Sequence, residues 1–150
     1  MVIQTTRFGP VDVDESRLLR FADGLVGFAG RTRFALVSTG QQSSFYWLQS
    51  VDVPDLAFVV TDPRLFIPTY QVAVRAEDSQ RLGAEPDQPL QLFVIVNKVD
   101  QLLTGNLQGP IMVNPANLES MQLVLSEKRY TTRHPLIHLP ASREALSRSA

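Results

Sequence analysis

The string in this sequence most suggestive of chemistry is Asn97-Lys98-Val99-Asp100, which directly follows the apolar run Leu92–Val96. Guanine-nucleotide-binding proteins read the base with an N-K-x-D loop placed after such a strand. That chemistry also needs a phosphate cradle of the form G-x-x-x-x-G-K-[ST], whose backbone N–H groups and lysine hold the anion. No glycine in this chain is followed by lysine. We therefore predict that the string is a strand ending in a polar turn and that it binds no nucleotide.

The two histidines have the spacing of a metal-binding pair on a helix. His134 and His138 are four residues apart, but Pro135 and Pro140 disfavour a helix there. The chain has no cysteine, which excludes disulfides, thiolate zinc sites and cysteine nucleophiles. We predict no metal site and no cofactor.

The carboxylates that are candidates for hydrolysis are also unfavourably placed. Asp52 and Asp55 lie in a proline-containing turn rather than on two sides of a cleft. We therefore predict that the chain is not an enzyme. An alternative stays open: a small-molecule-binding β-barrel or a hydrolase, with His134 and the Asp52/Asp55 turn lining a pocket.

Strand signals dominate the elements that must position these residues. Tyr70, Val72 and Val74 alternate with polar or small residues, as in a half-buried strand. Short apolar runs bounded by turn formers predict further strands. Three of them look buried on both faces, Leu56–Val60, Leu92–Val96 and Ile111–Val113, and Met121–Leu125 is similar. Ten prolines and eight glycines punctuate the chain throughout. This pattern predicts an all-β fold, a compact turn-rich β pseudo-barrel or sandwich.

Helix signals are few, and the core is expected on the strands. Glu77–Leu82, stopped by Gly83, and Ala116–Ser120 predict one or two short helices. The residues expected inside are the alternate positions of the two longest apolar runs: Leu56, Phe58, Val60, Leu92, Val94 and Val96.

Length and composition favour one domain in the cytoplasm. The chain has 150 residues and a net charge of −1, so residues 1–140 are expected to form a single β domain and 141–150 a polar, frayed tail. The near-neutral charge argues against direct nucleic-acid binding. No apolar run approaches the roughly 20 residues that span a bilayer, and the N-terminus lacks the pattern of a secretory signal, so we expect no membrane contact.

Several strings together resemble the flagellar assembly factor FliW family. They are spread in order over roughly residues 5–137. They are Arg7-Phe8-Gly9, Gly24-Leu25-Val26-Gly27-Phe28, Trp47-Leu48-Gln49-Ser50, Pro54-Asp55-Leu56-Ala57-Phe58-Val59-Val60, Asp62-Pro63, Pro68-Thr69-Tyr70, Thr104-Gly105-Asn106-Leu107, Pro110-Ile111, Val113-Asn114, Tyr130 and Arg133-His134-Pro135-Leu136. One departure bears on function: Thr69 stands where the family has an acidic residue.

The resemblance implies a regulator rather than an enzyme. Family members bind the translational repressor CsrA and relieve its block on flagellin mRNA, and they also bind flagellin, so that flagellin synthesis is coupled to assembly. The implied fold is a turn-rich β pseudo-barrel, and the protein is expected to be monomeric when free. Residues 52–100 hold eight acidic and four basic side chains, a charge that would attract a basic RNA-binding partner such as CsrA.

One apolar loop, with carboxylates nearby, is the candidate surface for that partner. Interfaces favour an aromatic or aliphatic anchor inside a polar rim, and loops normally run over the surface. The predicted partner-binding residues are Asp55, Asp62, Phe66, Ile67, Tyr70 and Gln71. The turn Leu103–Asn106 is the second choice.

Overall fold

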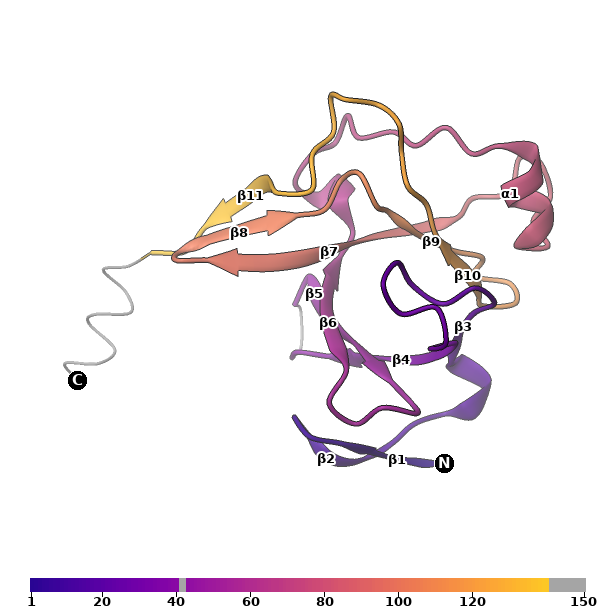
Figure 1. Cartoon of the computed structure of the whole chain (residues 1–150), viewed down its shortest axis with the longest axis vertical. Coiled ribbons are helices and arrows are strands. Elements are labelled where there is room, and N and C mark those ends of the chain that lie inside the picture. Colours follow the sequence, from indigo (N-terminus) through magenta and orange to yellow (C-terminus); the bar gives the residue numbers. More distant parts are fainter. Residues whose placement is uncertain (41–42, 141–150) are drawn as a thin grey trace.

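The computed structural model describes residues 1–40 and 43–140 of the chain. In this part the chain forms eleven strands, two short 3-10 helices and one α-helix (Figure 1). The strands are β1 (Val2–Thr5), β2 (Gly9–Asp12), β3 (Leu19–Phe21), β4 (Arg33–Ser38), β5 (Phe45–Ser50), β6 (Ala57–Thr61), β7 (Gln91–Val99), β8 (Leu102–Gly105), β9 (Ile111–Val113), β10 (Glu119–Gln122) and β11 (His134–His138). The helical elements are η1 (Glu15–Arg17), η2 (Pro63–Leu65) and α1 (Ala76–Arg81). The all-β prediction is confirmed.

Seven of the strands close into a barrel. Their order is β7-β6-β5-β4-β3-β10-β9, and β9 pairs back onto β7. The length of β7 makes closure possible, because its first residues pair with β9 while its later ones pair with β6 and β8. All of these pairings are antiparallel except the one between β3 and β10.

Alternate residues of the barrel strands fill its interior. Phe34, Leu48 and Val60 are at most 1% exposed and belong to one core cluster with Phe21 and Phe93. Because successive side chains point to opposite faces of a strand, one set faces inward and the next outward. The loop over residues 22–31 lies within the ring in the view of Figure 1 and closes one end of the barrel.

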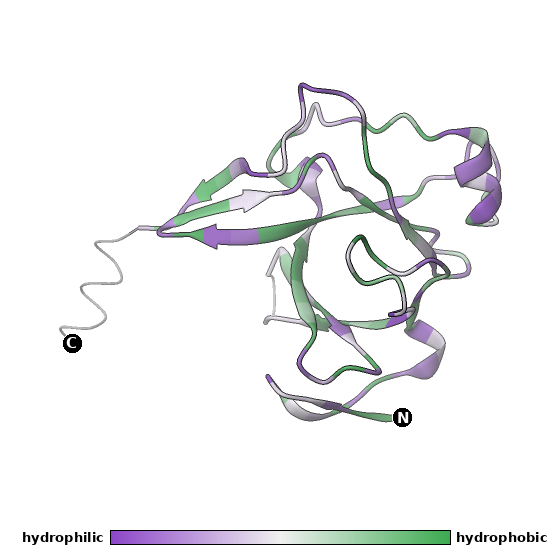
Figure 2. Ribbon diagram, viewed as in Figure 1, coloured by the Kyte–Doolittle hydropathy of each residue, from purple (hydrophilic) through white to green (hydrophobic). Residues whose placement is uncertain are grey.

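Two further layers cover outward-facing residues of the barrel. The β1–β2 hairpin contributes Ile3 to a cluster with Leu18 and Ala35. A larger cluster joins the outer face of β7 and β9 to the segments around α1, and its buried members are Tyr70, Leu82, Leu92, Val94, Leu107, Met112, Leu123 and Tyr130. The helix itself is largely hydrophilic and lies outside the ring (Figure 2).

The second half of β7 leaves the barrel and forms an arm with β8 and β11 (Figure 1). The turn between β7 and β8 contains Asp100, whose φ of 54° is in the left-handed region that aspartate tolerates. The Asn97-Lys98-Val99-Asp100 string is thus the end of a strand and its turn, as predicted. His134 and His138 lie on β11, with a register shift between Pro135 and Ile137.

The predicted core is confirmed in four of its six positions. Val60, Leu92, Val94 and Val96 are buried. Leu56 and Phe58 are only half-buried against the core, so the run Leu56–Val60 is not buried on both faces. Its first residues lie at the end of the barrel, where Phe58 meets Phe28 of the closing loop edge to face.

One helix prediction is confirmed and the other is wrong. The segment Glu77–Arg81 lies on α1, Leu82 is the C-cap of that helix, and Gly83 follows at a φ of 64°. Residues 115–117 form a turn instead of a helix. Side-chain oxygens of Asn114 and Asn117 accept hydrogen bonds from the backbone two residues on, which favours a turn over a helix.

The strand predicted at Tyr70, Val72 and Val74 is also wrong. The segment is unpaired, and the backbone N–H of Tyr70 donates to Ile67 in a turn. Tyr70 and Val72 pack in the outer cluster, whereas Val74 is exposed, so the alternation follows burial at its first two positions only. The predicted tail 141–150 lies outside the described residues. In residues 1–40 and 43–140, none of the helices has the length and apolar character needed to cross a bilayer.

Candidate protein-binding surface

The predicted partner loop begins at η2, which Asp62 positions. The Asp62 carboxylate accepts a hydrogen bond from the backbone N–H of Arg64 at 2.9 Å and so caps the 3-10 turn. Pro63 takes the first helical position, which its fixed φ suits. The chain therefore turns sharply where β6 ends, and the residues that follow lie at the rim of the barrel.

The charge of Asp62 is already balanced within the loop. Its carboxylate accepts from Arg64 Nη2 at 3.1 Å and from Gln91 Nε2 at 3.3 Å. Partial burial alone raises the pKa of this carboxyl, but the hydrogen bonds and charge of Arg64 outweigh it and hold the pKa below its ordinary value. Asp62 is therefore a structural cap as well as a surface carboxylate.

The apolar residues of the loop differ in their exposure. Leu65 is 61% exposed. Phe66 is half-buried, and its ring lies 5.8 Å from that of Phe45, centroid to centroid. Ile67 is half-buried against the outer cluster. Sequence reasoning selected Phe66 and Ile67, whereas Leu65 presents the most free apolar surface, because η2 turns it away from the core.

Tyr70 does not lie on the surface, which corrects its prediction as an exposed anchor. It is 2% exposed, and its hydroxyl donates to the carbonyl oxygen of Leu107 at 2.6 Å. Burial, with Tyr130 and Glu127 nearby, raises its pKa well above the ordinary value. Gln71 is exposed, and its backbone is held by the Tyr130 hydroxyl. Tyr70 therefore anchors the end of the loop in the core and does not contribute to its exposed surface.

Asp55 lies at the other end of β6 from Asp62. Five strand residues at about 3.3 Å each separate the two carboxylates by roughly 16 Å or more, so they do not form one rim. Asp55 accepts a hydrogen bond from the Thr6 hydroxyl. The turn that carries it is held from inside by Gln49, whose Nε2 lies 3.2 Å from the carbonyl oxygens of Pro54 and Leu56.

A groove opens beside the η2 loop at the end of the barrel opposite the closing loop. Its volume is about 540 Å³. Its walls include Leu65 and Asp62 from the loop, Leu36 and Tyr46 from β4 and β5, and Arg17 from η1. Sequence reasoning missed Leu36 and Arg17, because only the barrel brings these distant segments to one rim.

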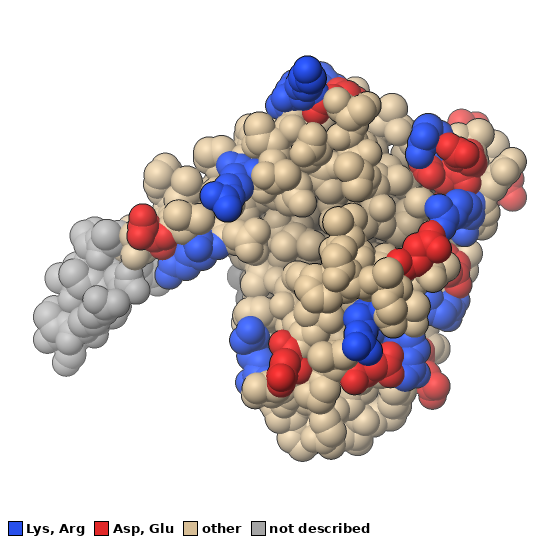
Figure 3. All heavy atoms as spheres, viewed as in Figure 1, with Lys and Arg blue, Asp and Glu red and all other residues tan. Residues whose placement is uncertain are grey.

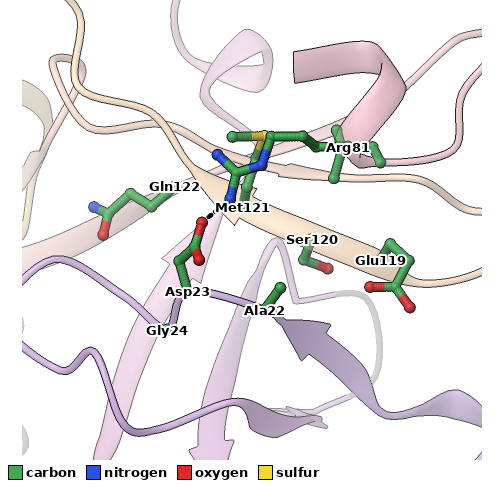
Figure 4. A pocket seen from close by; sticks show the side chains of 9 residues that line it. Ala22, Asp23, Gly24, Arg81, Glu119, Ser120, Met121 and Gln122 are labelled. Atoms are coloured by element: carbon green, nitrogen blue, oxygen red, sulfur yellow. Dashed lines mark ion pairs between the residues drawn. The ribbon is translucent and has the colours of Figure 1, made fainter. Parts of the chain in front are cut away.

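A second pocket lies between α1, β10 and the start of the closing loop (Figure 4). Asp23 and Arg81 point toward each other across it and form an ion pair. Its volume is about 90 Å³, whereas ligand sites usually hold about 300–1,000 Å³. The pocket is therefore a polar contact between the closing loop and α1, held by the Asp23–Arg81 ion pair.

Charges of both signs lie side by side on the surface (Figure 3). Four of the eight acidic residues in 52–100 form ion pairs: Asp52 with Arg33, Asp62 with Arg64, and Glu77 and Asp78 with Arg75. The acidic excess of this segment is therefore partly neutralised in the folded chain, and Asp55 is one of the carboxylates outside such pairs in the described residues.

The residues of the alternative pocket are not brought together. His134 lies on β11 in the arm, and β8 and β7 separate that strand from β6. Asp52 and Asp55 precede β6, and Asp52 is paired with Arg33 at 2.6 Å. The described residues hold no group of three or more histidine and carboxylate side chains arranged for a metal ion.

Comparison with known proteins gives consistent results over nearly the whole chain. The family model described as FliW protein matches residues 2–136. The chain is 40% identical to the flagellar assembly factor FliW of Geobacter sulfurreducens, over 97% of this chain and 92% of the relative. It is 37% identical to that of Geotalea uraniireducens, over 97% and 90%. A crystal structure of the flagellar assembly factor FliW superposes with a TM-score of 0.83 at 31% identity, covering 91% of this chain and 97% of the other.

Proposed function

The chain belongs to the FliW family of flagellar assembly factors, and from that premise we propose that it is a non-enzymatic regulator of flagellin synthesis. It binds the translational repressor CsrA, thereby relieving repression of flagellin mRNA, and it binds flagellin. Free flagellin then withdraws it from CsrA and couples synthesis to assembly. The observation that carries the proposal is the family match over residues 2–136.

The barrel interior supports a binding role over catalysis. The inward side chains Phe21, Phe34, Leu48 and Val60 fill the ring at 1% exposure or less, so the barrel encloses packed side chains rather than a substrate. Both proposed partners act in the cytoplasm, where we place this protein. We also propose that it touches neither nucleic acid nor membrane and is monomeric when free.

The η2 loop is the proposed contact with CsrA. Leu65 and Phe66 supply apolar surface, and the Asp62–Arg64 pair and Gln71 supply a polar rim. Interface anchors cost about 2 kcal/mol or more when truncated to alanine, roughly 30-fold in affinity. Ile67 belongs to the same surface, but its packing against the outer cluster means that its truncation also affects stability.

The experiment is calorimetry of the purified protein with CsrA and with flagellin, each separately. We expect binding to both, and a loss of most CsrA affinity in Leu65→Ala or Phe66→Ala. Val124→Ala is the matched control, because Val124 is 74% exposed and lies outside this loop. Asp55→Asn should mainly slow association with a basic partner.

Three outcomes decide between the possibilities. Absence of binding to both partners contradicts the proposed function. Binding with unchanged affinity in folded Leu65→Ala and Phe66→Ala moves the site elsewhere, first to Leu103–Asn106, which spans the end of β8 and the residue after it. Loss of binding in Val124→Ala as well as in the loop variants shows that the effect is not specific to the loop.

A further inference from the structure

Half of strand β4 has a free edge although the barrel is closed. Strand β4 pairs with β5 along Phe34–Ser38, but with β3 only at Arg33 and Phe34. The chain before β3 turns away through η1. Within residues 1–40 and 43–140, Leu36–Ser38 therefore pairs with no strand on the side of β3.

The backbone groups on this edge point away from β5. The carbonyl of Arg33 accepts from the N–H of Val51 at 3.0 Å, so Arg33 faces β5. Hydrogen-bonding direction alternates along an antiparallel strand. The N–H and C=O groups of Leu36 and Ser38 consequently point into the gap that β3 leaves, and the Leu36 side chain is 36% exposed.

Two grooves meet at this edge. The groove of about 540 Å³ at the end of the barrel and another of about 500 Å³ beside β2 share Arg17, Leu36 and Ser38 as lining residues. The first has Tyr46 and Leu65 in its walls, and the second has Val11 among others. A strand laid along β4 would send alternate side chains to opposite faces, so each groove would receive one set.

The charges around this edge favour an acidic segment. Two of the three carboxylates that line the grooves form ion pairs, Asp12 with the N-terminal ammonium at 3.4 Å and Asp62 with Arg64, and the third, Asp14, accepts hydrogen bonds from Ser16. The exposed Arg17 side chain makes no hydrogen bond or ion pair with any part of the chain that the structure describes. Arg17 lies close enough to Asp14 to act on its charge, and the exposed N–H groups of its guanidinium remain available to an acidic ligand.

We propose that the Leu36–Ser38 edge binds an extended segment of a partner protein as an added β-strand, with alternating apolar side chains and an acidic residue opposite Arg17. In such complexes the main chain supplies hydrogen bonds and the side-chain pockets supply selectivity. The inference rests on the proposed function only in taking the partner to be a protein. It concerns the edge of β4, although the neighbouring groove also includes Leu65 of the η2 loop.

The test begins with a library of displayed twelve-residue peptides selected on the full-length protein. Selected peptides should alternate apolar residues and carry an acidic one. Their binding should slow hydrogen exchange at the amides of Leu36 and Ser38. Ser38→Pro, which removes the edge N–H, and Arg17→Glu should each weaken binding about tenfold or more.

Matched variants separate this mode from general damage. Ser38→Ala loses the hydroxyl contacts with Gly40 but keeps the N–H, and Arg31→Glu reverses an exposed charge at the end of the closing loop, two residues before β4. Both should bind within about twofold of the parent. Circular dichroism checks whether Ser38→Pro is folded. If Ser38→Pro does not fold, peptide binding to Arg17→Glu alone tests the proposal.

The inference is overturned if no peptide is enriched, or if enriched peptides bind Ser38→Pro and Arg17→Glu as tightly as the parent. CsrA and flagellin, tested on the same variants, distinguish this failure from that of the proposed function. If CsrA or flagellin binds all variants equally and no peptide adds a strand to β4, the strand-addition inference fails and the proposed function holds. If peptides bind in a way that requires the Ser38 N–H but neither CsrA nor flagellin binds, the strand-addition inference holds and the proposed function fails.

Discussion

The rings of Tyr70 and Tyr130 meet edge to face, with their centroids 4.8 Å apart. The Tyr70 hydroxyl donates to Leu107, and the Tyr130 hydroxyl donates to the carbonyl of Gln71 at 3.3 Å. The pair thus joins the end of the η2 loop to the segment that carries Leu107 and to the segment that carries Tyr130. The surface at Leu65 and Phe66 depends on this buried support for its position.

Removal of the Tyr70 hydroxyl should destabilise the fold. In Tyr70→Phe the Leu107 carbonyl loses its donor in a buried site, which costs about 1–3 kcal/mol in free energy of unfolding. Urea denaturation followed by tryptophan fluorescence measures this cost. Tyr46→Phe is the control, because no hydrogen bond to the Tyr46 hydroxyl is present in the described residues, and its stability should stay within about 0.5 kcal/mol of the parent. Equal losses in the two variants would contradict the role given to the Tyr70 hydroxyl.

Tyr70 should also make stability fall at alkaline pH. Burial first, then Tyr130 and Glu127, raise its pKa in the folded state. A raised folded pKa contributes stability that is complete below the unfolded pKa, about 10, and is lost as the pH rises further. The free energy of unfolding should therefore decrease from pH 9 to pH 11 in the parent and less steeply in Tyr70→Phe. Identical slopes would show that Tyr70 does not titrate in this way.

Asp62 should act in the opposite pH range. Its burial raises the pKa, but the hydrogen bonds and charge of Arg64 lower it further, so the folded pKa lies below the ordinary value. The resulting stability is present above the unfolded pKa, about 3.9, and is lost as the pH falls through the folded one. Thermal unfolding between pH 5 and pH 2.5 should show a smaller acid dependence in Asp62→Asn. Arg64→Gln should reduce it similarly; an unchanged acid dependence in both variants would refute the assignment.

The closing loop should tolerate alanine at one glycine and not at another. Gly24 has a φ of 70°, and a Cβ there would lie 2.6 Å from the carbonyl oxygen of Ala29. Gly27 has a φ of 85° but open space around its Cβ position. Gly27→Ala should therefore cost only the conformational strain of about 1–2 kcal/mol, whereas Gly24→Ala adds a backbone clash. Melting temperatures compare the two; a Gly24→Ala protein as stable as Gly27→Ala would sink the argument.

The strands of the barrel were largely predictable because short apolar runs between turn formers have few other stable arrangements. Val94 and Val96 are buried as their run predicts, and Gly83 follows the end of α1 as its position predicts. The segment from Tyr70 to Val74 has the same alternation as a strand but no partner. Periodicity indicated the burial of Tyr70 and Val72 but not the exposure of Val74, and it cannot report whether another strand is within hydrogen-bonding distance.

The sequence by itself determined the β class, the absence of cysteine chemistry and of a glycine–lysine phosphate loop, and the family, because these depend on residue type and local order. Only the tertiary structure decided which residues of the candidate loop face solvent. It buried Tyr70, exposed Leu65, and set Asp55 and Asp62 at opposite ends of β6. It also brought Arg17 to the free edge of β4. Closure of the barrel sets these relations through pairings between distant strands, and no local pattern of side chains encodes where such a closure leaves a gap.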